Sequence, residues 1–255
     1  IWNSNQERSN SEKPQKMIGR SSHQSIVCLA KKIHLLLKVF KVIEDFFDNS
    51  VGKENLPLNN GTFYFNTFKT LNTHQYYHTN KYSVGTLVYD NQYYNTVNLK
   101  YDSFRDVLVF KPFGESENFG IILISEKVLH FTINNKNFTN LSFITKDSLK
   151  NVKGYYEENL KGKDFTFYIK HKKDRREFIK NQVVYADFGI YNEFLIFKSN
   201  IYHPIKSKKD VTILFPIHKK EINTFYSDNS KLSKDNKTEF YEKLFRFIDH
   251  LTSIK

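Results

Sequence analysis

The change of hydrophobic period after Gly61 constrains the fold more than any other feature of this chain. From there to Lys206 the sequence consists of short runs rich in β-branched and aromatic residues, with Asn, Gly and Lys clustered between them. Such runs predict strands joined by tight turns. The expected strands are residues 62–68, 83–89, 92–101, 106–111, 119–124, 128–133, 138–144, 154–160, 164–170, 191–197 and 201–206. Together they predict an antiparallel β-meander that forms a curled or barrel-like sheet.

Alternation inside the runs predicts which faces are buried, because successive strand residues point to opposite sides. In 128–133 the expected core face is Leu129, Phe131 and Ile133, with His130 and Thr132 toward solvent. In 164–170 it is Phe165, Phe167 and Ile169, with Thr166 and Lys170 toward solvent. Runs 106–110 and 120–124 are apolar on both faces, so we expect them in the middle of the sheet or under a helix.

Helical periodicity occurs on both sides of the β region. An amphipathic helix is expected at 26–48, where apolar residues recur at alternating spacings of three and four. They are Ile26, Leu29, Ile33, Leu36, Phe40, Ile43 and Phe47. This stripe either packs on the following domain or contacts a partner or membrane surface.

At the carboxyl end, Ser207–Asp210 resembles a capping box and Pro216 should end the helix that follows it. Two more helices are expected at 217–226 and 236–252, the last with an apolar stripe. The stripe is Phe240, Leu244, Phe247 and Leu251. The carboxyl end should therefore form a cluster of about three helices packed on the sheet.

These signals divide the chain into five parts and predict an α+β fold. Residues 1–25 form a polar tail that cannot bury enough apolar surface to offset its ordering entropy, so it should be disordered. The amphipathic helix at 26–48 and a linker at 49–61 lead to the antiparallel β domain at 62–206 and the C-terminal helices at 207–255. No run approaches the roughly 18 apolar residues of a membrane-spanning helix.

The formal charge of +12 suggests a polyanionic partner such as nucleic acid. Of the 39 basic residues, however, 33 are Lys and 6 are Arg, whereas nucleic-acid readers lean on Arg for bidentate contacts. An excess of Lys, Asn, Ile, Phe and Tyr is also what AT-rich coding produces. The charge alone therefore does not predict a nucleic-acid partner.

The single cysteine, Cys28, excludes a disulfide within this sequence and is expected to be an apolar helix residue.

Tyr101, Asp102, Arg105 and Asp106 are the candidate functional residues of the β domain. Two carboxylates four positions apart could act as general acid and base or hold a cation. In the alternative, Asp102 accepts hydrogen bonds from backbone amides in an Asx turn and Asp106 pairs with a nearby Lys or Arg. We favour this structural interpretation.

The densest basic run, residues 170–176, supplies the second set of candidates. Lys172, Lys173, Arg175 and Arg176 could contact the phosphates of a single strand while neighbouring aromatic rings stack on its bases. A solvated hairpin end beside core aromatics would give the same string, and we prefer that interpretation.

His74 and His78 have the spacing of two zinc ligands on a helix, but the Glu of the metalloprotease motif is absent and the segment has a loop composition. No metal and no cofactor are expected.

The chain also lacks a Gly-rich phosphate loop and a nucleophile elbow, so no catalytic residue is assigned and the protein is not expected to be an enzyme. A site assembled from distant loops would leave no such motif.

The stretch Tyr82–Pro112 predicts a hairpin with its turn at Asp90-Asn91. Simple alternation divides the second strand into two faces. One face is Tyr93, Val97, Leu99 and Tyr101, and the other is Tyr94, Thr96, Asn98 and Lys100.

The ordered features of this stretch are Gly85, Tyr89, Asp90-Asn91, Tyr94, Val97, Leu99-Lys100-Tyr101-Asp102, Asp106 and Leu108. In this pattern the chain resembles an uncharacterised family of β-rich, mostly exported Bacteroidetes proteins. Matching features at 154–157, 161–162 and 207–210 extend the resemblance over about residues 60–252. Asn91 stands where glycine is commoner, and the amino-terminal segment lacks the clean signal peptide usual in the family. The resemblance implies a periplasmic or cell-envelope location and supplies no catalytic residues.

Three functional hypotheses follow. The first is a non-enzymatic interaction protein of the envelope or cell surface, with another envelope protein as its partner. The second is a nucleic-acid-binding module that uses Lys-, Tyr- and Phe-rich strands. The third is an enzyme whose loop carboxylates are Asp102 and Asp106. The first is preferred because it agrees with both the family resemblance and the aromatic antiparallel sheet.

Overall fold

The computed structural model describes residues 56–143 and 152–253, all within the compact unit Glu54–Lys255. The predicted tail at 1–25, the amphipathic helix at 26–48 and most of the linker at 49–61 lie outside the described residues. The described end of the linker is a 3-10 turn, η2 (Pro57–Asn59), which places Leu58 in the core.

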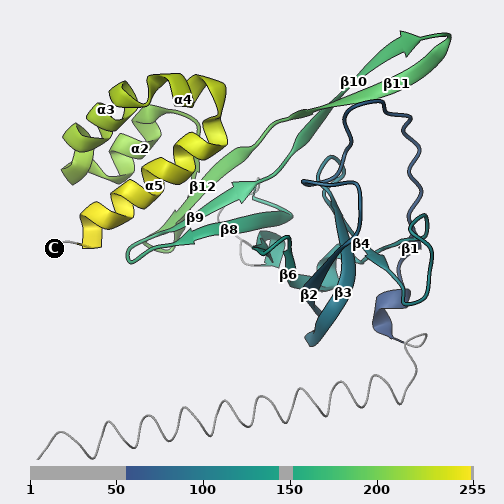
Figure 1. The fold of residues 1–255 in the computed structure, drawn as a ribbon. Helices are drawn as coiled ribbons and strands as arrows, with labels where there is room; N and C mark the ends of the chain where they lie inside the picture. The colour runs from purple at the N-terminus through teal and green to yellow at the C-terminus, as the bar shows by residue number, and fades with distance from the viewer. Residues whose placement is uncertain (1–55, 144–151, 254–255) are drawn as a thin grey trace, which may run out of the picture. The chain divides into compact units, whose positions relative to one another are not determined.

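Eleven strands form one antiparallel sheet, which confirms the predicted antiparallel α+β fold for the described residues (Figure 1). They are β1 (Thr62–Phe63), β2 (Ser83–Tyr89), β3 (Gln92–Asp102), β4 (Val107–Lys111), β5 (Ile121–Ile122), β6 (Val128–Ile133), β7 (Lys136–Asn140), β8 (Tyr155–Lys161), β9 (Thr166–Lys170), β12 (Glu193–Lys198) and β13 (Ile201–Ile205). Their order is β1-β5-β4-β3-β2-β6-β7-β8-β9-β12-β13. Because β1 and β13 end this order without pairing to each other, the described sheet is open, and the barrel-like form of the prediction is not found.

Hairpin turns form where Asn, Asp and Gly predicted them. Three of the two-residue turns between expected strands have positive φ at both positions, the geometry that matches strand twist. They are Asp90-Asn91, Asn134-Asn135 and Ser199-Asn200, with φ between 49° and 64°. A longer turn at Gly162 joins β8 to β9, closed by a hydrogen bond from the Gly162 N–H to the Phe165 carbonyl at 2.9 Å.

Strand β3 departs from simple alternation at Thr96. The pairing of β2 with β3 shifts by one residue there, so Thr96 is an extra residue with a φ of 66°. The bulge puts Tyr94 into the core beside Val97 and leaves Tyr93 42% exposed. The predicted faces of the two tyrosines are therefore wrong, because one inserted residue reverses the alternation on one side of it.

The first apolar cluster lies over β2 to β8 and is rich in aromatic rings. Phe131 and Phe138 stack across β6 and β7 with ring centroids 4.8 Å apart and an interplanar angle of 2°. Strand β4 is buried on both sides, since Leu108 belongs to this cluster while Val109 packs with Tyr64 on the other face. The prediction that 106–110 is an interior strand buried on both faces is confirmed, although β4 is third from one end of the sheet order. Run 120–124 is not central, because it forms only the two-residue β5 beside the edge strand β1.

Both faces of β9 are buried, which only half agrees with the prediction. Phe165, Phe167 and Ile169 form the expected core face and pack against the C-terminal helices. On the face expected to meet solvent, Tyr168 joins another apolar cluster and Lys170 is only 7% exposed. The prediction for Lys170 was wrong because an ion pair, described below, lets its ammonium be buried.

Four α-helices follow β13, and α4 was not predicted. They are α2 (Lys208–Leu214), α3 (Lys219–Asp228), α4 (Ser230–Asp235) and α5 (Lys237–Ser253). The predicted capping box is present, with the Ser207 N–H donating to Asp210 Oδ2 at 2.8 Å. Pro216 begins a 3-10 turn that ends α2. None of the helices in the described ranges is long and apolar enough to cross a membrane.

The buried side of α5 is rotated from the predicted stripe. Phe240 and Leu244 are buried as expected, but the other buried positions are Tyr241, Phe245 and Ile248. Phe247 and Leu251 are half-buried. The helix therefore presents a wider face to the sheet than an alternating three-and-four stripe provides.

The residues between β9 and β12 in the sequence form a second, two-stranded sheet, where no strand was predicted. It is the hairpin of β10 (Lys173–Lys180) and β11 (Val183–Ile190), which turns at Asn181-Gln182 (Figure 1). Six of the eight residues of β10 are charged, so the alternation of apolar and polar residues that marks a half-buried strand is absent.

Gly85→Ala should test the close approach of β2 to β6. A Cβ at this position would lie 1.9 Å from the Thr132 carbonyl oxygen, so backbone must move. We expect the free energy of unfolding to fall by about 1–3 kcal/mol in urea titrations. Val84→Ala, next to it but 64% exposed, is the control and should change stability little. Equal stabilities of the two variants would contradict the close approach.

Candidate functional site

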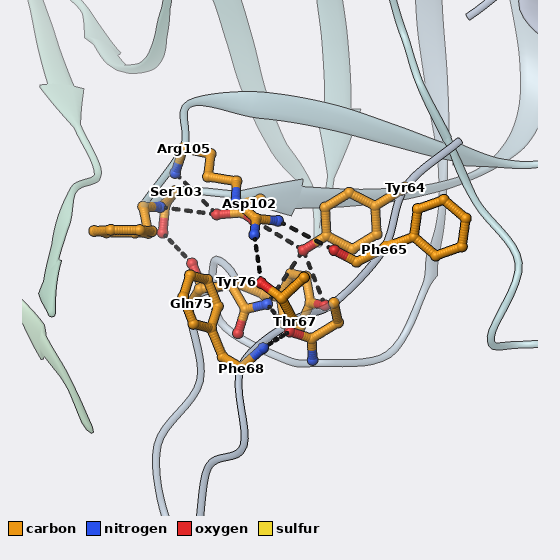
Figure 2. Close-up of polar contacts among 11 residues, drawn as sticks. Tyr64, Phe65, Thr67, Phe68, Gln75, Tyr76, Asp102, Ser103 and Arg105 are labelled. Carbon is orange, nitrogen blue, oxygen red and sulfur yellow. Dashed lines mark hydrogen bonds and ion pairs between the residues drawn. The ribbon is translucent and has the colours of Figure 1, made fainter. Parts of the chain in front are cut away.

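Asp102 is fully buried at the end of β3 and is the central acceptor of a polar network (Figure 2). Its Oδ1 accepts hydrogen bonds from the backbone N–H groups of Phe104 at 3.1 Å and Arg105 at 3.0 Å. Its Oδ2 accepts from the Tyr64 hydroxyl at 2.8 Å. Burial raises the pKa of Asp102, although these hydrogen bonds and the nearby guanidinium act in the opposite direction. The predicted Asx turn at Asp102 is confirmed.

The network ties the loop between β1 and β2 to the turn between β3 and β4. The Gln75 carbonyl accepts from the Ser103 N–H and hydroxyl, each at 3.1 Å. The Gln75 side chain donates to the Tyr64 hydroxyl at 3.2 Å, and the Tyr76 hydroxyl lies 3.1 Å from the same oxygen. Since Gln75 and Asp102 are both fully buried, these bonds have no competition from solvent.

Arg105 closes the network on its more exposed side (Figure 2). Its guanidinium lies 3.6 Å from Asp102 Oδ2 and donates to the Thr67 hydroxyl at 3.2 Å. It also lies 4.9 Å from the centre of the Phe68 ring, a cation–π distance. Arg105 thus balances the buried charge and holds the loop at the same time.

Asp106 belongs to a separate cluster with Tyr101 and Lys170. Its carboxylate accepts from the Tyr101 hydroxyl at 2.7 Å and from Lys170 Nζ at 2.6 Å. Burial, together with the negative charge of Asp106, raises the pKa of Tyr101 well above its ordinary value, so the hydroxyl stays a donor. Gly154 passes so close that a Cβ there would lie 1.8 Å from Asp106 Oδ2. The predicted pairing of Asp106 with a basic residue is confirmed, and the partner is Lys170.

The four candidate residues therefore form two structural clusters rather than one reaction centre. Asp102 with Arg105 fixes a loop, and Asp106 with Tyr101 fixes the path of the chain before β8. In both carboxylates the oxygens are occupied by protein donors. This arrangement suits the stabilisation of a turn and gives acid–base chemistry no free group.

Two of the four basic candidates, Lys172 and Lys173, line one pocket. Lys172 pairs with Glu193 at 2.8 Å. Lys173 Nζ donates to the carbonyl of His74 at 2.5 Å, and burial lowers the pKa of this lysine. Both residues line a pocket of about 390 Å³ together with three histidines.

The other two basic candidates lie farther along β10 and on opposite faces of it. Arg175 pairs with Glu177 at 3.4 Å and lies 5.1 Å from the Phe68 ring centre. Arg176 is exposed on the other face, opposite Asp187 of β11. The structure therefore does not gather the four basic residues into one strip.

A buried Glu157–His171 pair beside the pocket was not predicted. Glu157 is 1% exposed, and its Oε2 lies 2.5 Å from His171 Nε2. Its Oε1 accepts from Lys136 Nζ at 2.8 Å and from the Asn159 side chain at 2.7 Å. Burial alone would raise the pKa of Glu157, but these hydrogen bonds outweigh it and lower the pKa to about 2. The only sequence signal is a Glu directly after the two tyrosines that begin β8.

His74 and His78 lie in a loop, as their composition predicted, and their spacing does not produce a helical zinc pair. Both line the pocket that His171 also reaches. Within the described residues no group of three or more His, Cys, Asp or Glu side chains could hold a metal ion.

Comparison of the chain with protein-family models, with curated proteins and with solved structures found no match.

Substitutions at Asp102 should reduce stability in a graded way. Asp102→Asn keeps an Oδ1 acceptor for the turn but loses the charge, and we expect a loss of about 1–3 kcal/mol in the free energy of unfolding. Asp102→Ala leaves Tyr64 and Arg105 without their acceptor and should cost about 3–5 kcal/mol. Asp90→Asn, in an exposed ion pair with Lys127, is the control and should cost less than about 1 kcal/mol. If D102A were as mild as the control, the network would not support the loop.

The low pKa of Glu157 makes a signed prediction for acid stability. The ordinary value is 4.5 and the folded value about 2, so the group stabilises the fold above pH 4.5 and this contribution disappears as the pH falls to 2. The shift corresponds to about 3 kcal/mol. We expect the stability difference between the wild type and Glu157→Gln, measured by urea titration, to shrink over this range. A difference that stays constant with pH would contradict the low pKa.

Proposed function

We propose that this chain is a non-enzymatic interaction protein of the cell envelope or cell surface, and that the β10–β11 hairpin contacts its partner. The observation that carries the proposal is the exposure of the hairpin. Seven of the eight residues of β10 are exposed, and within the described residues β10 pairs only with β11. Its outer edge therefore offers backbone groups to another strand.

The end of the hairpin carries apolar side chains that belong to none of the core clusters. Ile179 is 75% exposed and Val184, directly opposite it, is 53% exposed. On the other face the Phe178 and Tyr185 rings stack on each other with centroids 5.8 Å apart. An ordered pair of apolar faces at the end of a hairpin supports a contact surface better than scattered exposed residues do.

The partner chemistry follows from the composition of β10. Four of its side chains are basic and two are acidic, so a strand with acidic residues would complement it. An envelope protein that adds such a strand to the edge of β10 fits this surface. The envelope location rests on the resemblance to a mostly exported family.

The other two hypotheses have less support. Lys172 and Arg175 already have ion-pair partners, and Arg175 and Arg176 lie on opposite faces of β10, which weighs against a continuous track for phosphates. Asp102 and Asp106 are held by donors on the protein, which weighs against their use as acid and base. A hairpin that meets a protein partner needs neither group.

The hairpin end can be tested with envelope vesicles from the source organism. Wild-type protein should sediment with the vesicles, and the double variant Ile179→Thr/Val184→Thr should lose most of this binding while keeping β propensity. Ile213→Thr/Ile217→Thr is the matched control, because these residues are 64% and 74% exposed on the C-terminal helices. The control should bind like the wild type.

Two outcomes would overturn the proposal. Equal binding by the hairpin variant would exclude the hairpin as the contact. Binding that survives protease treatment of the vesicles would identify a lipid surface rather than a protein. Fractionation of the source cells tests the location separately, and a wholly cytoplasmic protein would exclude the envelope.

A further inference from the structure

The pocket beside Lys173 is built from segments that are far apart in the sequence. Loop residues 72–78 form one side, the 171–173 junction and the base of β11 form another, and Ser103 and Asn192 complete it. Its volume of about 390 Å³ lies in the range of small-molecule sites.

Hydrogen bonds across the pocket hold its sides together. Lys173 Nζ donates to the His74 carbonyl at 2.5 Å. The Phe188 N–H donates to the Thr73 hydroxyl at 2.8 Å, and this hydroxyl donates to Asp187 at 2.8 Å. Because the loop and the hairpin base are joined at several points, the pocket is formed before any ligand arrives.

The lining carries two ammonium groups and several hydrogen-bond donors, and no carboxylate lies among the described residues that line it. The charged groups are Lys172, which pairs with Glu193, and Lys173. The three histidines add imidazole nitrogens, and burial lowers the pKa of His74.

The carboxylates nearby already have protein partners: Glu193 pairs with Lys172, Glu157 with His171, and Asp187 accepts from Thr73. The buried Asp102 is held in its own network, although its charge acts on Lys173. Such a lining favours a negatively charged group in the pocket.

Lys173 is the group with unused binding capacity. An ammonium has three donors, and the contact seen for Lys173 is the one to the His74 carbonyl. The described residues provide it with no ion-pair partner within 4.0 Å. Burial lowers the pKa of Lys173 even though the charge of Asp102 acts in the opposite direction, so an anion that binds directly beside this half-buried ammonium would stabilise it.

Aromatic rings also line the pocket. Tyr77 lies with its ring centre 4.6 Å from that of His171, and Phe188 lines the hairpin side. Flat apolar surfaces next to a cation suit a ligand with an aromatic body and an anionic end.

We propose that this pocket binds a small organic oxyanion with a ring-sized apolar body, and that Lys173 is its main charged contact. This binding site is independent of the protein partner proposed for the hairpin end. No reaction is assigned to it.

Calorimetric titration at physiological salt tests the site with phenyl phosphate as probe and with inorganic phosphate and phenol as partial probes. Phenyl phosphate should bind, inorganic phosphate should bind more weakly, and phenol should not bind measurably. Lys173→Gln should weaken phenyl phosphate binding by at least about tenfold, the effect of one charge-assisted hydrogen bond. Lys180→Gln makes the same charge change at the exposed far end of β10 and should alter affinity less than twofold.

A second variant keeps the test independent of the loop contact made by Lys173. Asn192→Asp retains the Oδ1 acceptor of the Lys172 N–H but places a negative charge at the pocket, so it should also weaken binding. The proposal is overturned if the wild type does not bind phenyl phosphate, if both pocket variants bind it like the wild type, or if K180Q weakens it as much as K173Q. Since these measurements use no envelope vesicles, failure here leaves the hairpin proposal unaffected.

Discussion

The hydrogen bonds and ion pair of the buried Asp102 carboxylate are the interactions on which the loop between β1 and β2, and the surfaces this loop supports, depend. The carboxylate accepts two backbone amides of its own turn and the Tyr64 hydroxyl, and thereby fixes where the loop between β1 and β2 begins. The same loop then supports the hairpin, since the Lys69 carbonyl accepts from the Ala186 N–H at 2.8 Å. Farther along, the loop forms one wall of the pocket. The buried carboxylate at one turn thus positions both the base of the β10–β11 hairpin and one wall of the pocket, which lie outside the main core.

This arrangement explains why a hairpin with little core of its own keeps a defined position. Two-stranded hairpins are marginal in water unless something packs against them. Here Phe188 packs against Phe68 and Phe104 with centroids 5.3 Å apart in both cases, and Arg175 lies over the Phe68 ring. The packing ends before Ile179 and Val184, so the base of the hairpin is held while its end stays exposed. The charges on β10 also fit the usual protection of an exposed edge against self-association, so a partner must match them to pair there.

Local chemistry explains which parts of the fold the sequence could predict. Turn positions such as Asp90-Asn91 follow from the tolerance of Asn and Asp for positive φ, and the capping box at Ser207 follows from hydrogen bonds within four residues. The bulge at Thr96 has no such signature, because a Thr at positive φ is imposed by the pairing of β3 with β2. The β10 strand was missed for a related reason. Its stability comes from its neighbour and its base, not from an alternating pattern.

The same difference between local chemistry and distant partners decides which residues of the candidate site could be predicted. The roles of Asp102 and Asp106 could be predicted because short carboxylates near turns have few local options. Lys170, His171 and Glu157 could not, since each has its position through partners on other strands, such as Lys170 with Asp106 across 64 residues.

The hairpin and the pocket share residues, which sets how the two surfaces influence each other. Lys173 begins β10 and lines the pocket, and Phe188 belongs to β11 and lines it too. A ligand stabilises only the arrangement of the hairpin base in which it binds, so its effect on a partner at the hairpin end depends on whether the base can adopt another arrangement. The base is held by the Phe68 packing and the loop hydrogen bonds in the absence of any ligand. Occupation of the pocket would then add stability to a hairpin already in position, and coupling between the two surfaces would be weak and reciprocal.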